Sequence, residues 1–573
     1  MHGRQRTASI GRYFWPAAVL ASLLAFLLFD RPLAADCGGL DSALSVSEAL
    51  ALAEMGEKEV IQVQGVVTAA FPGRQGLNGF FLQSIESENV RGGFVYAPDL
   101  ALSDWHRIEP GSLLLLTARP GQWQGRAQLQ RVQSVSHCGD RPLPSPAALD
   151  LPAERDELER LHGRLVTLPD DLVVTGNDQL GRFGSLKLSA GDRLFRHQVP
   201  DDGRLHRIVL DDGSYARHPD PVPYLDARGT RRVGDRVRAL TGVLVEAFDD
   251  WRLHPVSSPD FFTGNPRPEL PQSPAGLRVA AFNVENYFVT LGRRGAADDA
   301  ELQRQRDKLF AALERQDAHL LALVEVENSR TALADLVQRL NARLPEERRY
   351  AMLDGPVRRG DDAIKVALIY RPTELEPLSG AETDPHPVHN RPPVFAAFRD
   401  RASDRRFIAA AVHFKAKVGC PQQGDIDRGQ GCWNRLRTEQ AEALLEAATD
   451  AARRHETDQI LLAGDFNSYA EEDPINLIQR HGYVDLVADH LPPKRRYSYV
   501  FRGESGTLDY IFASNSLAGA VTGVDIWHIN ADEPVFLAFD QRGGGAPGSR
   551  GQPWRSSDHD PVIIGIRRHR PAD

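Results

Sequence analysis

The sequence predicts a multidomain protein whose N-terminal half is all β and whose C-terminal half is α/β. The chain has 573 residues, which at about 150 residues per domain is enough for three or four domains. Its first half carries short β-type runs separated by Gly, Pro and Asn, whereas strand-like and helix-like segments alternate from Leu277 onward. We therefore expect a signal segment at 1–35, a small barrel at 36–145, a second β-rich domain at 146–265, a linker at 266–276 and an α/β domain at 277–570.

The N-terminus has the pattern of an export signal. Arginines precede an apolar run at residues 13–29, and small residues follow just before Asp36. A retained membrane anchor is the alternative, because a run of this length is at the lower edge of what spans a bilayer. We favour cleavage, which predicts a secreted or periplasmic protein with no stable membrane association.

The four cysteines of the chain predict two disulfides. An even number of cysteines in an exported chain favours disulfide bonds, and no CxxC pair indicates zinc. Of the three possible pairings we predict Cys37 with Cys138 and Cys420 with Cys432. The second bond would close the glycine-rich loop CPQQGDIDRGQGC, which has little core of its own.

The expected barrel begins with runs such as EVIQVQGVVTAAF and GFFLQS, followed by three more short runs up to residue 135. The glycine in VQGVV and the GFFLQ run resemble the first two strands of an OB-fold. The aromatic residues Phe80, Phe81, Tyr96 and Trp123 could stack on bases there, but aromatics in short strands are more often core, which we favour. The β-rich segment that follows shows no catalytic set, and its task is open.

The expected α/β domain has three clear helices, at 299–316, 331–344 and 436–454, which carry apolar residues at helical spacing. Strands are predicted at 278–282, 320–324, 366–370, 407–412, 460–464, 509–512 and 562–566.

Polar residues of a few kinds recur where these strands end. The buried run ILLAG leads directly to Asp465 and then Asn467, which a strand would point to the same side. A turn explains that pair equally well, since Asp and Asn start turns. A turn does not naturally explain the whole set, which is Asn283, Glu285, Glu325, Glu327, His413, Asp465, Asn467, Asp509, Asp558 and His559.

The chemistry of these side chains gives them a common purpose. Several carboxylates at ligand distance suit Mg²⁺ or Mn²⁺, which prefer hard oxygen donors. A histidine beside a carboxylate suits proton transfer or charge stabilisation, and amides can hold a water or a phosphate oxygen. Together these groups predict in-line hydrolysis of a phosphate ester.

The series FNVEN, LVEVEN, VHFKAK, LAGDFN, TLDYIF and SDHDP resembles the endonuclease/exonuclease/phosphatase superfamily, whose fold is that of DNase I. The resemblance covers the last half of the chain and implies a four-layer α/β sandwich. The stretches GCWN at 431–434 and DAIKVALIYRP at 362–372 are similar to those of secreted bacterial extracellular nucleases, which also carry an OB-like domain upstream.

The resemblance implies roles for individual residues. Glu325 looks like the principal metal ligand, with Asn283 and Glu285 as partners and Asp558 on the metal side. The remaining residues would be catalytic: Asp465 and Asn467 would position water and phosphate, Asp509 would orient His559, and His413 is a candidate proton donor to the leaving oxygen. The division of acid and base among His413, Asp465 and His559 differs within the superfamily and is left open.

Two further features have competing interpretations. Lys415 and Arg437 could contact substrate phosphates, but Lys415 could simply be exposed and Arg437 also fits a helix start. Asp425 and Asp427 could hold Ca²⁺ as a structural ion, but a solvated turn is the favoured interpretation because the spacing falls short of an EF-hand loop.

The resemblance implies a secreted, metal-dependent endonuclease that hydrolyses extracellular DNA, or RNA, by attack of an activated water. The formal net charge of -10 argues against a nonspecific nucleic-acid coat, which would be basic. Two alternatives stay open: a phosphomonoesterase or a lipid or inositol phosphodiesterase on the same fold, and a nucleic-acid-binding protein with an inactive catalytic domain. No protein partner is evident.

Overall fold

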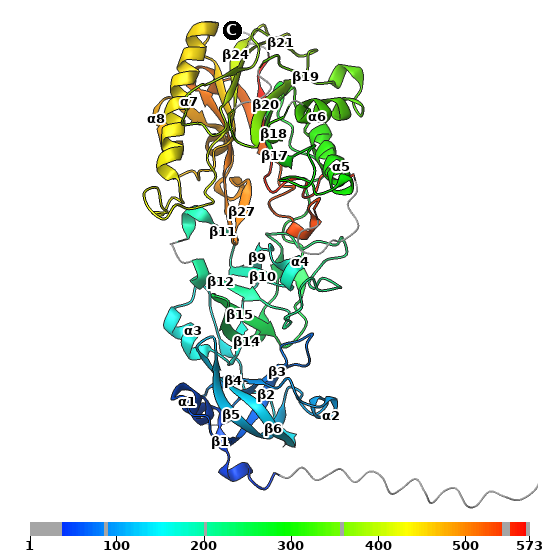
Figure 1. Cartoon of the computed structure of the whole chain (residues 1–573), viewed down its shortest axis with the longest axis vertical. Coiled ribbons are helices and arrows are strands. Elements are labelled where there is room, and N and C mark those ends of the chain that lie inside the picture. Colours follow the sequence, from blue (N-terminus) through cyan, green and yellow to red (C-terminus); the bar gives the residue numbers. More distant parts are fainter. Residues whose placement is uncertain are drawn as a thin grey trace, which may run out of the picture.

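The structure is a computed structural model that describes residues 37–84, 90–199, 203–329, 331–355, 360–540 and 551–568. The predicted signal segment at 1–35 lies outside these ranges. Figure 1 shows three parts stacked along the long axis of the molecule: a β-barrel, a middle β region and an α/β domain. Within the described ranges, no helix has the length and apolar character needed to cross a membrane.

The first part is a closed barrel of five strands: β2 (Ile61–Phe71), β3 (Gly79–Gln83), β4 (Gly92–Tyr96), β5 (Ser112–Trp123) and β6 (Arg126–Asp140). β2 pairs antiparallel with both β3 and β5, while β6 pairs antiparallel with β5 and parallel with β4, so the ring of strands closes. Helix α1 (Val46–Glu54) packs its apolar side against the barrel core. The Cys37–Cys138 disulfide ties the start of the described chain to β6, as predicted.

The middle β region is built on a nine-stranded sheet, with the strand order β16-β13-β9-β10-β12-β15-β14-β8-β7. Its strands are β7 (Ala147–Ala148), β8 (Leu165–Leu168), β9 (Leu172–Gly176), β10 (Leu186–Ala190), β12 (Arg207–Leu210), β13 (Arg236–Val237), β14 (Leu240–Ala247), β15 (Asp250–Pro255) and β16 (Phe261–Phe262). Its hydrophobic core includes Phe536 and Leu537, which come from the α/β domain. The two parts therefore share a core.

The α/β domain contains two facing sheets. The first has the order β19-β20-β18-β17-β31-β30, with β19 (Ala351–Met352), β20 (Ile364–Tyr370), β18 (Leu320–Glu327), β17 (Leu277–Tyr287), β31 (Val562–Ile566) and β30 (Val521–Ile526). The second has the order β21-β23-β24-β25-β29-β26, with β21 (Leu375–Pro377), β23 (Val394–Asp400), β24 (Arg406–His413), β25 (Ile460–Asp465), β29 (Asp509–Ser514) and β26 (Tyr483–Asp485). One apolar cluster fills the space between the sheets.

Helices cover the outer face of each sheet, which gives four layers (Figure 1). α5 (Asp299–Gln316) and α6 (Ala332–Asn341) pack on the first sheet, and α7 (Asn434–His455) and α8 (Asp473–Arg480) pack on the second. α5 shows why the prediction succeeded: Asp298 caps its N-terminus by accepting from the Glu301 N–H, and Leu302, Leu309 and Leu313 are buried at helical spacing.

A small sheet joins the middle β region to the α/β domain. β11 (Leu194–Phe195) pairs in parallel with β28 (Glu504–Gly506), and β28 pairs antiparallel with β27 (Tyr499–Phe501). These last two strands form a hairpin that extends from the α/β domain toward the middle β region (Figure 1).

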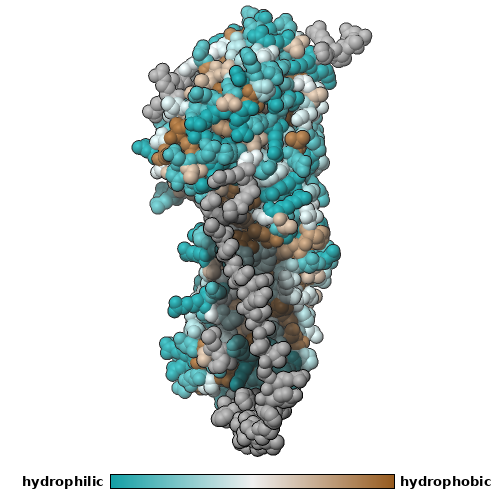
Figure 2. Space-filling model, turned by 90° about the vertical axis from the view of Figure 1, so that its right-hand side faces the viewer, coloured by the Kyte–Doolittle hydropathy of each residue, from teal (hydrophilic) through white to brown (hydrophobic). Residues whose placement is uncertain are grey.

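The prediction that the aromatic residues of the barrel are core residues is only partly correct. Phe80 and Phe81 are core residues, but Tyr96 and Trp123 are 37% and 41% exposed. Both line a cleft of about 730 Å³ between the barrel and the middle β region, where Tyr215 and Phe248 are also exposed. The face in Figure 2 is otherwise largely hydrophilic, with small scattered hydrophobic patches.

Candidate active site

The candidate site lies where strands of both sheets end. His413 and Asp465 close the neighbouring parallel strands β24 and β25, and Asp509 opens β29 opposite Asp465. From the other sheet, the Asn283 Nδ2 atom on β17 lies 3.3 Å from Asp465 Oδ2. His559, in the loop before β31, is also 2.7 Å from Asp509. The structure thus brings together side chains that are far apart in the sequence.

His559 is held by a carboxylate and an aromatic ring. Its Nδ1 atom lies 2.7 Å from Asp509 Oδ2, which also accepts a hydrogen bond of 2.6 Å from the Ser498 hydroxyl. The Tyr499 ring lies 4.6 Å from the imidazole, centroid to centroid. Burial alone would lower the pKa of His559, but Asp509 and the carboxylates nearby hold that pKa well above its ordinary value. The histidine is therefore positively charged at neutral pH.

The pKa of Asp465 is shifted by a different cause from that of His559. It is almost completely buried, and burial raises its pKa. Its Oδ1 atom accepts a hydrogen bond of 2.8 Å from the Asn467 backbone N–H, which is the turn that the sequence also allowed. Asn467 has a φ of 48°, a left-handed conformation that Asn tolerates. The turn and the candidate site are therefore the same feature.

Glu325, the predicted principal metal ligand, lies near His413 in the candidate site. It accepts a hydrogen bond of 3.1 Å from the Asn286 backbone N–H, and its other oxygen is 4.0 Å from His413 Nε2. Burial and the negative charge of Asp558 raise the pKa of Glu325. Two partly buried carboxylates that repel each other form an oxygen donor pair that fits a hard divalent cation.

Other predicted residues have structural partners. The Glu285 backbone N–H donates to Asn283 Oδ1, while the Glu327 carboxylate accepts from the backbone N–H groups of Val289 and Thr290. In the part of the chain that the structure describes, one tight carboxylate–histidine group occurs, Asp465, Asp509 and His559, whose ligand atoms lie within 4.8 Å of one another. Since Asp509 and His559 already bind each other, we interpret this group as a catalytic cluster.

Sequence reasoning missed Arg391. Its guanidinium is buried, lies 2.8 Å from His413 Nε2 and donates to the Phe414 carbonyl. Burial and the Arg391 charge together lower the pKa of His413 well below its ordinary value, so this histidine is neutral. The RPP stretch that begins at Arg391 was the available signal, but Arg391 is in contact with His413 only after folding.

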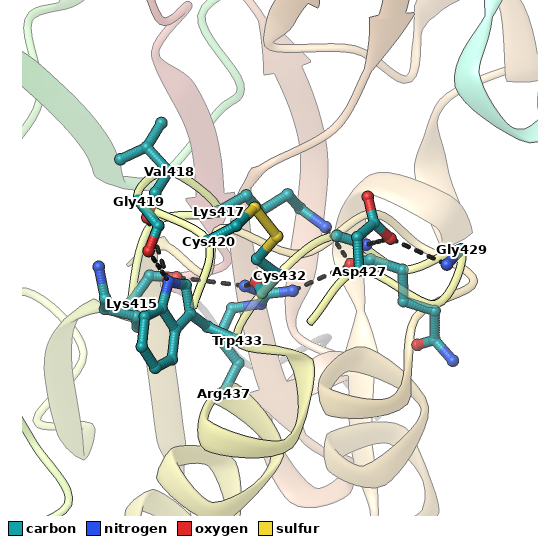
Figure 3. Close-up of a disulfide and its surroundings, with 12 residues drawn as sticks. Lys415, Lys417, Val418, Gly419, Cys420, Asp427, Gly429, Cys432, Trp433 and Arg437 are labelled. Carbon is teal, nitrogen blue, oxygen red and sulfur yellow. Dashed lines mark hydrogen bonds between the residues drawn. A yellow bond between two sulfur atoms is a disulfide. The ribbon is translucent and has the colours of Figure 1, made fainter. Parts of the chain in front are cut away.

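The disulfide between Cys420 and Cys432 is formed as predicted and closes a loop beside the site (Figure 3). The Lys415 ammonium lies 5.3 Å from the centre of the Trp433 ring. Arg437, in contrast, is fully buried and donates to the carbonyls of Cys432 and Gln430. It braces the loop and is not placed to contact a substrate phosphate, contrary to the sequence-based expectation.

The favoured turn interpretation of the two loop aspartates matches their contacts. Asp425 accepts from the backbone N–H groups of Arg435 and Leu436 at the start of α7, and Asp427 accepts from those of Gly429 and Gly431 (Figure 3 labels Asp427). Both carboxylates are thus engaged with backbone donors, and Ca²⁺ has no support from their arrangement.

Comparison with known proteins gives a family match. Residues 280–559 match the Endonuclease/Exonuclease/phosphatase family. The comparison with curated proteins returned no match. Similar solved structures include an endonuclease/exonuclease/phosphatase from Bacteroides vulgatus, which is 16% identical with a TM-score of 0.34 and covers 51% of this chain and 99% of its own.

Two further structures match at a similar level. The human Nocturnin catalytic domain with bound sulfate anion is 17% identical with a TM-score of 0.33, and covers 50% of this chain and 93% of its own. D. rerio TDP2 complexed with a single-strand DNA product is 17% identical with a TM-score of 0.33, and covers 50% and 97%. These scores carry no argument about activity, and the assignment rests on the family match and the site. Residues 280–559, which form most of the α/β domain, thus match the endonuclease/exonuclease/phosphatase family, whose members are phosphoester hydrolases that generally depend on divalent metals.

Proposed function

We propose that the protein is an exported, metal-dependent endonuclease that hydrolyses extracellular DNA. The observation that carries the proposal is the pairing of a charged His559 with Asp509 beside a second, buried carboxylate, Asp465. A protonated imidazole and a carboxylate with a raised pKa in one site provide a positive charge and a proton acceptor for phosphodiester hydrolysis.

Glu325 and Asp558 are the residues that would hold Mg²⁺ or Mn²⁺, with Asn283 and Glu285 beside them. When bound there, the ion supplies Lewis-acid stabilisation of the charge that develops on the phosphate. The pairing of hard oxygen donors with a hard cation supports this assignment.

The side chains of the site would supply the remaining catalytic functions. Asp465 accepts the proton of the attacking water, since its raised pKa makes it a better base than an ordinary aspartate. His559, kept charged by Asp509, stabilises the negative transition state. The neutral His413 would offer a hydrogen bond near the leaving oxygen, and Asn467, whose backbone N–H donates to Asp465, would contact the phosphate.

The two disulfides support export, and the N-terminal barrel supports nucleic acid as the substrate. Two disulfides are typical of proteins that fold in oxidising compartments. The barrel has the closed strand order expected of an OB-like domain, and the exposed rings of Tyr96 and Trp123 offer stacking surfaces for an unpaired strand.

A plasmid-relaxation assay tests the proposal. The full mature chain with Mg²⁺ should convert supercoiled DNA to nicked circles. A chelator should abolish nicking, and His559→Ala should leave only a small residual rate. His455→Ala is the matched control, because His455 also pairs with a carboxylate, Glu382 at 2.7 Å, but lies at the far end of α7. Absence of nicking by folded, metal-loaded protein would reject the DNase assignment. RNA, phosphomonoesters and phospholipids are then the substrates to compare.

A further inference from the structure

A short segment of the α/β domain, around Asp532 and Glu533, is held in place by contacts with the middle β region. Asp532 and Glu533 are both fully buried, and buried carboxylates are costly unless they are paired. Arg193 Nη2 donates to Asp532 Oδ1 at 2.8 Å, and Arg232 contacts both carboxylates. Arg267, in the stretch that follows the middle β region, adds hydrogen bonds of 2.8 and 2.7 Å to Glu533. The cations that neutralise this segment therefore come from outside the α/β domain.

The same segment holds the loop that carries His559. The Asn530 side-chain amide donates to the His559 carbonyl at 2.7 Å, and the Asn530 backbone N–H donates to Asp560 Oδ1 at 2.7 Å. Its side-chain oxygen also accepts a hydrogen bond of 2.8 Å from the Ser556 backbone N–H. Asn530 is two residues from Asp532, so the contacts that fix Asp532 extend to Ser556, His559 and Asp560 in the loop that carries the histidine.

A second route reaches Asp509. The Tyr497 hydroxyl donates to Asp532 Oδ2 at 3.0 Å, and its ring is stacked 3.9 Å from the ring of His528. The next residue, Ser498, donates to Asp509 Oδ2, the oxygen that binds His559. The carboxylate of Asp532 thus anchors both members of the His559–Asp509 pair.

Strand pairing provides a third connection. Arg193 immediately precedes β11, whose Leu194 and Phe195 pair with Glu504 and Ser505 on β28. β28 in turn pairs with β27, which carries the Tyr499 ring that faces His559. The Tyr499 ring, the Asp509 carboxylate and the loop that carries His559 are therefore all connected to the junction between the middle β region and the α/β domain.

We propose that the middle β region is a working part of the active site and that Arg193 is a positioning residue, which acts through Asp532 on the His559–Asp509 pair. The proposal rests on the proposed function only for its kinetic test. Groups that act in a transition state must be held to within a fraction of an ångström, and three attachments to the middle β region do this for His559. The middle β region, whose task sequence analysis left open, would therefore set the geometry of catalysis.

Arg193→Met in the full chain is the first test, with supercoiled DNA and Mg²⁺. We expect kcat to fall about tenfold with KM changed less than about twofold, because misplaced groups cost turnover more than binding. Arg371→Met is the matched control: Arg371 is as buried as Arg193 and pairs with Asp317 at 2.7 Å, but at the opposite end of the first sheet. It should lower the thermal midpoint and leave kcat unchanged. Equal kcat in the two variants would overturn the proposal.

Tyr497→Phe is the milder second variant, because it removes one hydroxyl and keeps the ring stack on His528. It should also lower kcat. In a His559→Ala background, Arg193→Met should cause no further loss of the residual rate, whereas an additive loss would show that Arg193 acts elsewhere.

A readout that needs no substrate separates this proposal from the proposed function. In ¹⁵N-histidine-labelled protein, the downfield Nδ1–H resonance of His559, assigned by its loss in His559→Ala, reports the bond to Asp509. It should shift or broaden in Arg193→Met and stay in place in Arg371→Met. An unchanged resonance in Arg193→Met contradicts positioning, even if the protein cuts no DNA.

Discussion

Asp465 and Asp509 stand directly opposite each other on the antiparallel strands β25 and β29, yet their carboxylates have different partners. Asp509 binds the charged His559 and the Ser498 hydroxyl, whereas Asp465 is bonded to neutral amide groups. These different environments support the proposed roles, in which Asp509 orients His559 and Asp465 accepts a proton, since paired carboxylates with unlike environments take unlike roles.

Replacing Asp509 should damage catalysis far more than stability. In Asp509→Asn, the amide can no longer stabilise a charged His559 or fix its tautomer, so we expect kcat for DNA nicking to fall about 10²-fold or more. Asp485→Asn is the control, since Asp485 is also buried but caps the short helix α9 (Leu486–His490). A kcat for Asp509→Asn equal to that of the control would remove Asp509 from the site.

Replacing Glu325 should weaken the metal dependence. In Glu325→Gln, we expect the Mg²⁺ concentration that gives half-maximal activity to rise by at least about 10–100-fold. Losing a hydrogen-bond partner of a metal ligand already weakens metal binding by that factor, and losing the ligand itself should weaken it at least as much. Calorimetric titration with Mg²⁺ should show the same loss. Glu327→Gln should leave both measurements near the wild-type values, because Glu327 is bonded to backbone N–H groups of the 289–290 turn. Unchanged metal affinity in Glu325→Gln would place the ion elsewhere.

Acid should loosen the junction between the middle β region and the α/β domain. Burial alone would raise the pKa values of Asp532 and Glu533. Arg193 and Arg232 hold the pKa of Asp532 below its ordinary value, and Arg232 and Arg267 do the same for Glu533. The unfolded chain then binds more protons than the folded one, so this stabilisation is complete above about pH 4–5 and is lost as pH falls through the folded-state pKa values.

Urea unfolding measured from about pH 6 down to about pH 3 checks this expectation. The free energy of unfolding should fall with pH in the native chain and fall less steeply in Asp532→Asn, although that variant is less stable throughout. Asp450→Asn, at an exposed position, should keep the native slope. An identical slope in Asp532→Asn would show that this carboxyl has an ordinary pKa.

The Cys420–Cys432 bond should protect its loop. In the chain-entropy picture, a bond that spans 12 residues contributes about 3 kcal/mol. The double variant Cys420→Ser/Cys432→Ser should be cut by protease between residues 420 and 432 while the rest of the chain stays intact. Removing Cys37 and Cys138 in the same way should leave this loop resistant. Equal resistance with and without the Cys420–Cys432 bond would mean that contacts such as those of Arg437 suffice.

The sequence predicted those features that depend on local pattern. The helix at 299–316 has a capping aspartate and a regular apolar spacing, and the structure has the same bounds. The polar residues at strand ends could be found because parallel strands deliver their ends to one edge of a sheet. The rule accounts for the meeting of His413 and Asp465 at the ends of the parallel strands β24 and β25, with Asp509 at the start of the antiparallel neighbour β29. Asn283 and His559 reach the same place only because the two sheets pack face to face.

Contacts between distant segments were beyond sequence reasoning. Arg391 lies against His413, and Tyr499 faces His559, but neither the RPP stretch at Arg391 nor the short strand that carries Tyr499 predicts these contacts. Arg437 was misassigned for the same reason, because a charged residue near a helix start predicts exposure unless its tertiary partners are known. The hydrogen bond from Arg193 to Asp532 joins residues that are 339 positions apart.

The shared core has a consequence for how the chain is made. Phe536 and Leu537 complete the hydrophobic core of the middle β region, although nearly the whole α/β domain separates them from it in the sequence. During synthesis or translocation, the middle β region therefore cannot complete its hydrophobic core until the last segments of the chain are present. We expect fragments that stop before residue 535 to depend on chaperones and to aggregate, and the site to assemble only once the entire polypeptide has been released.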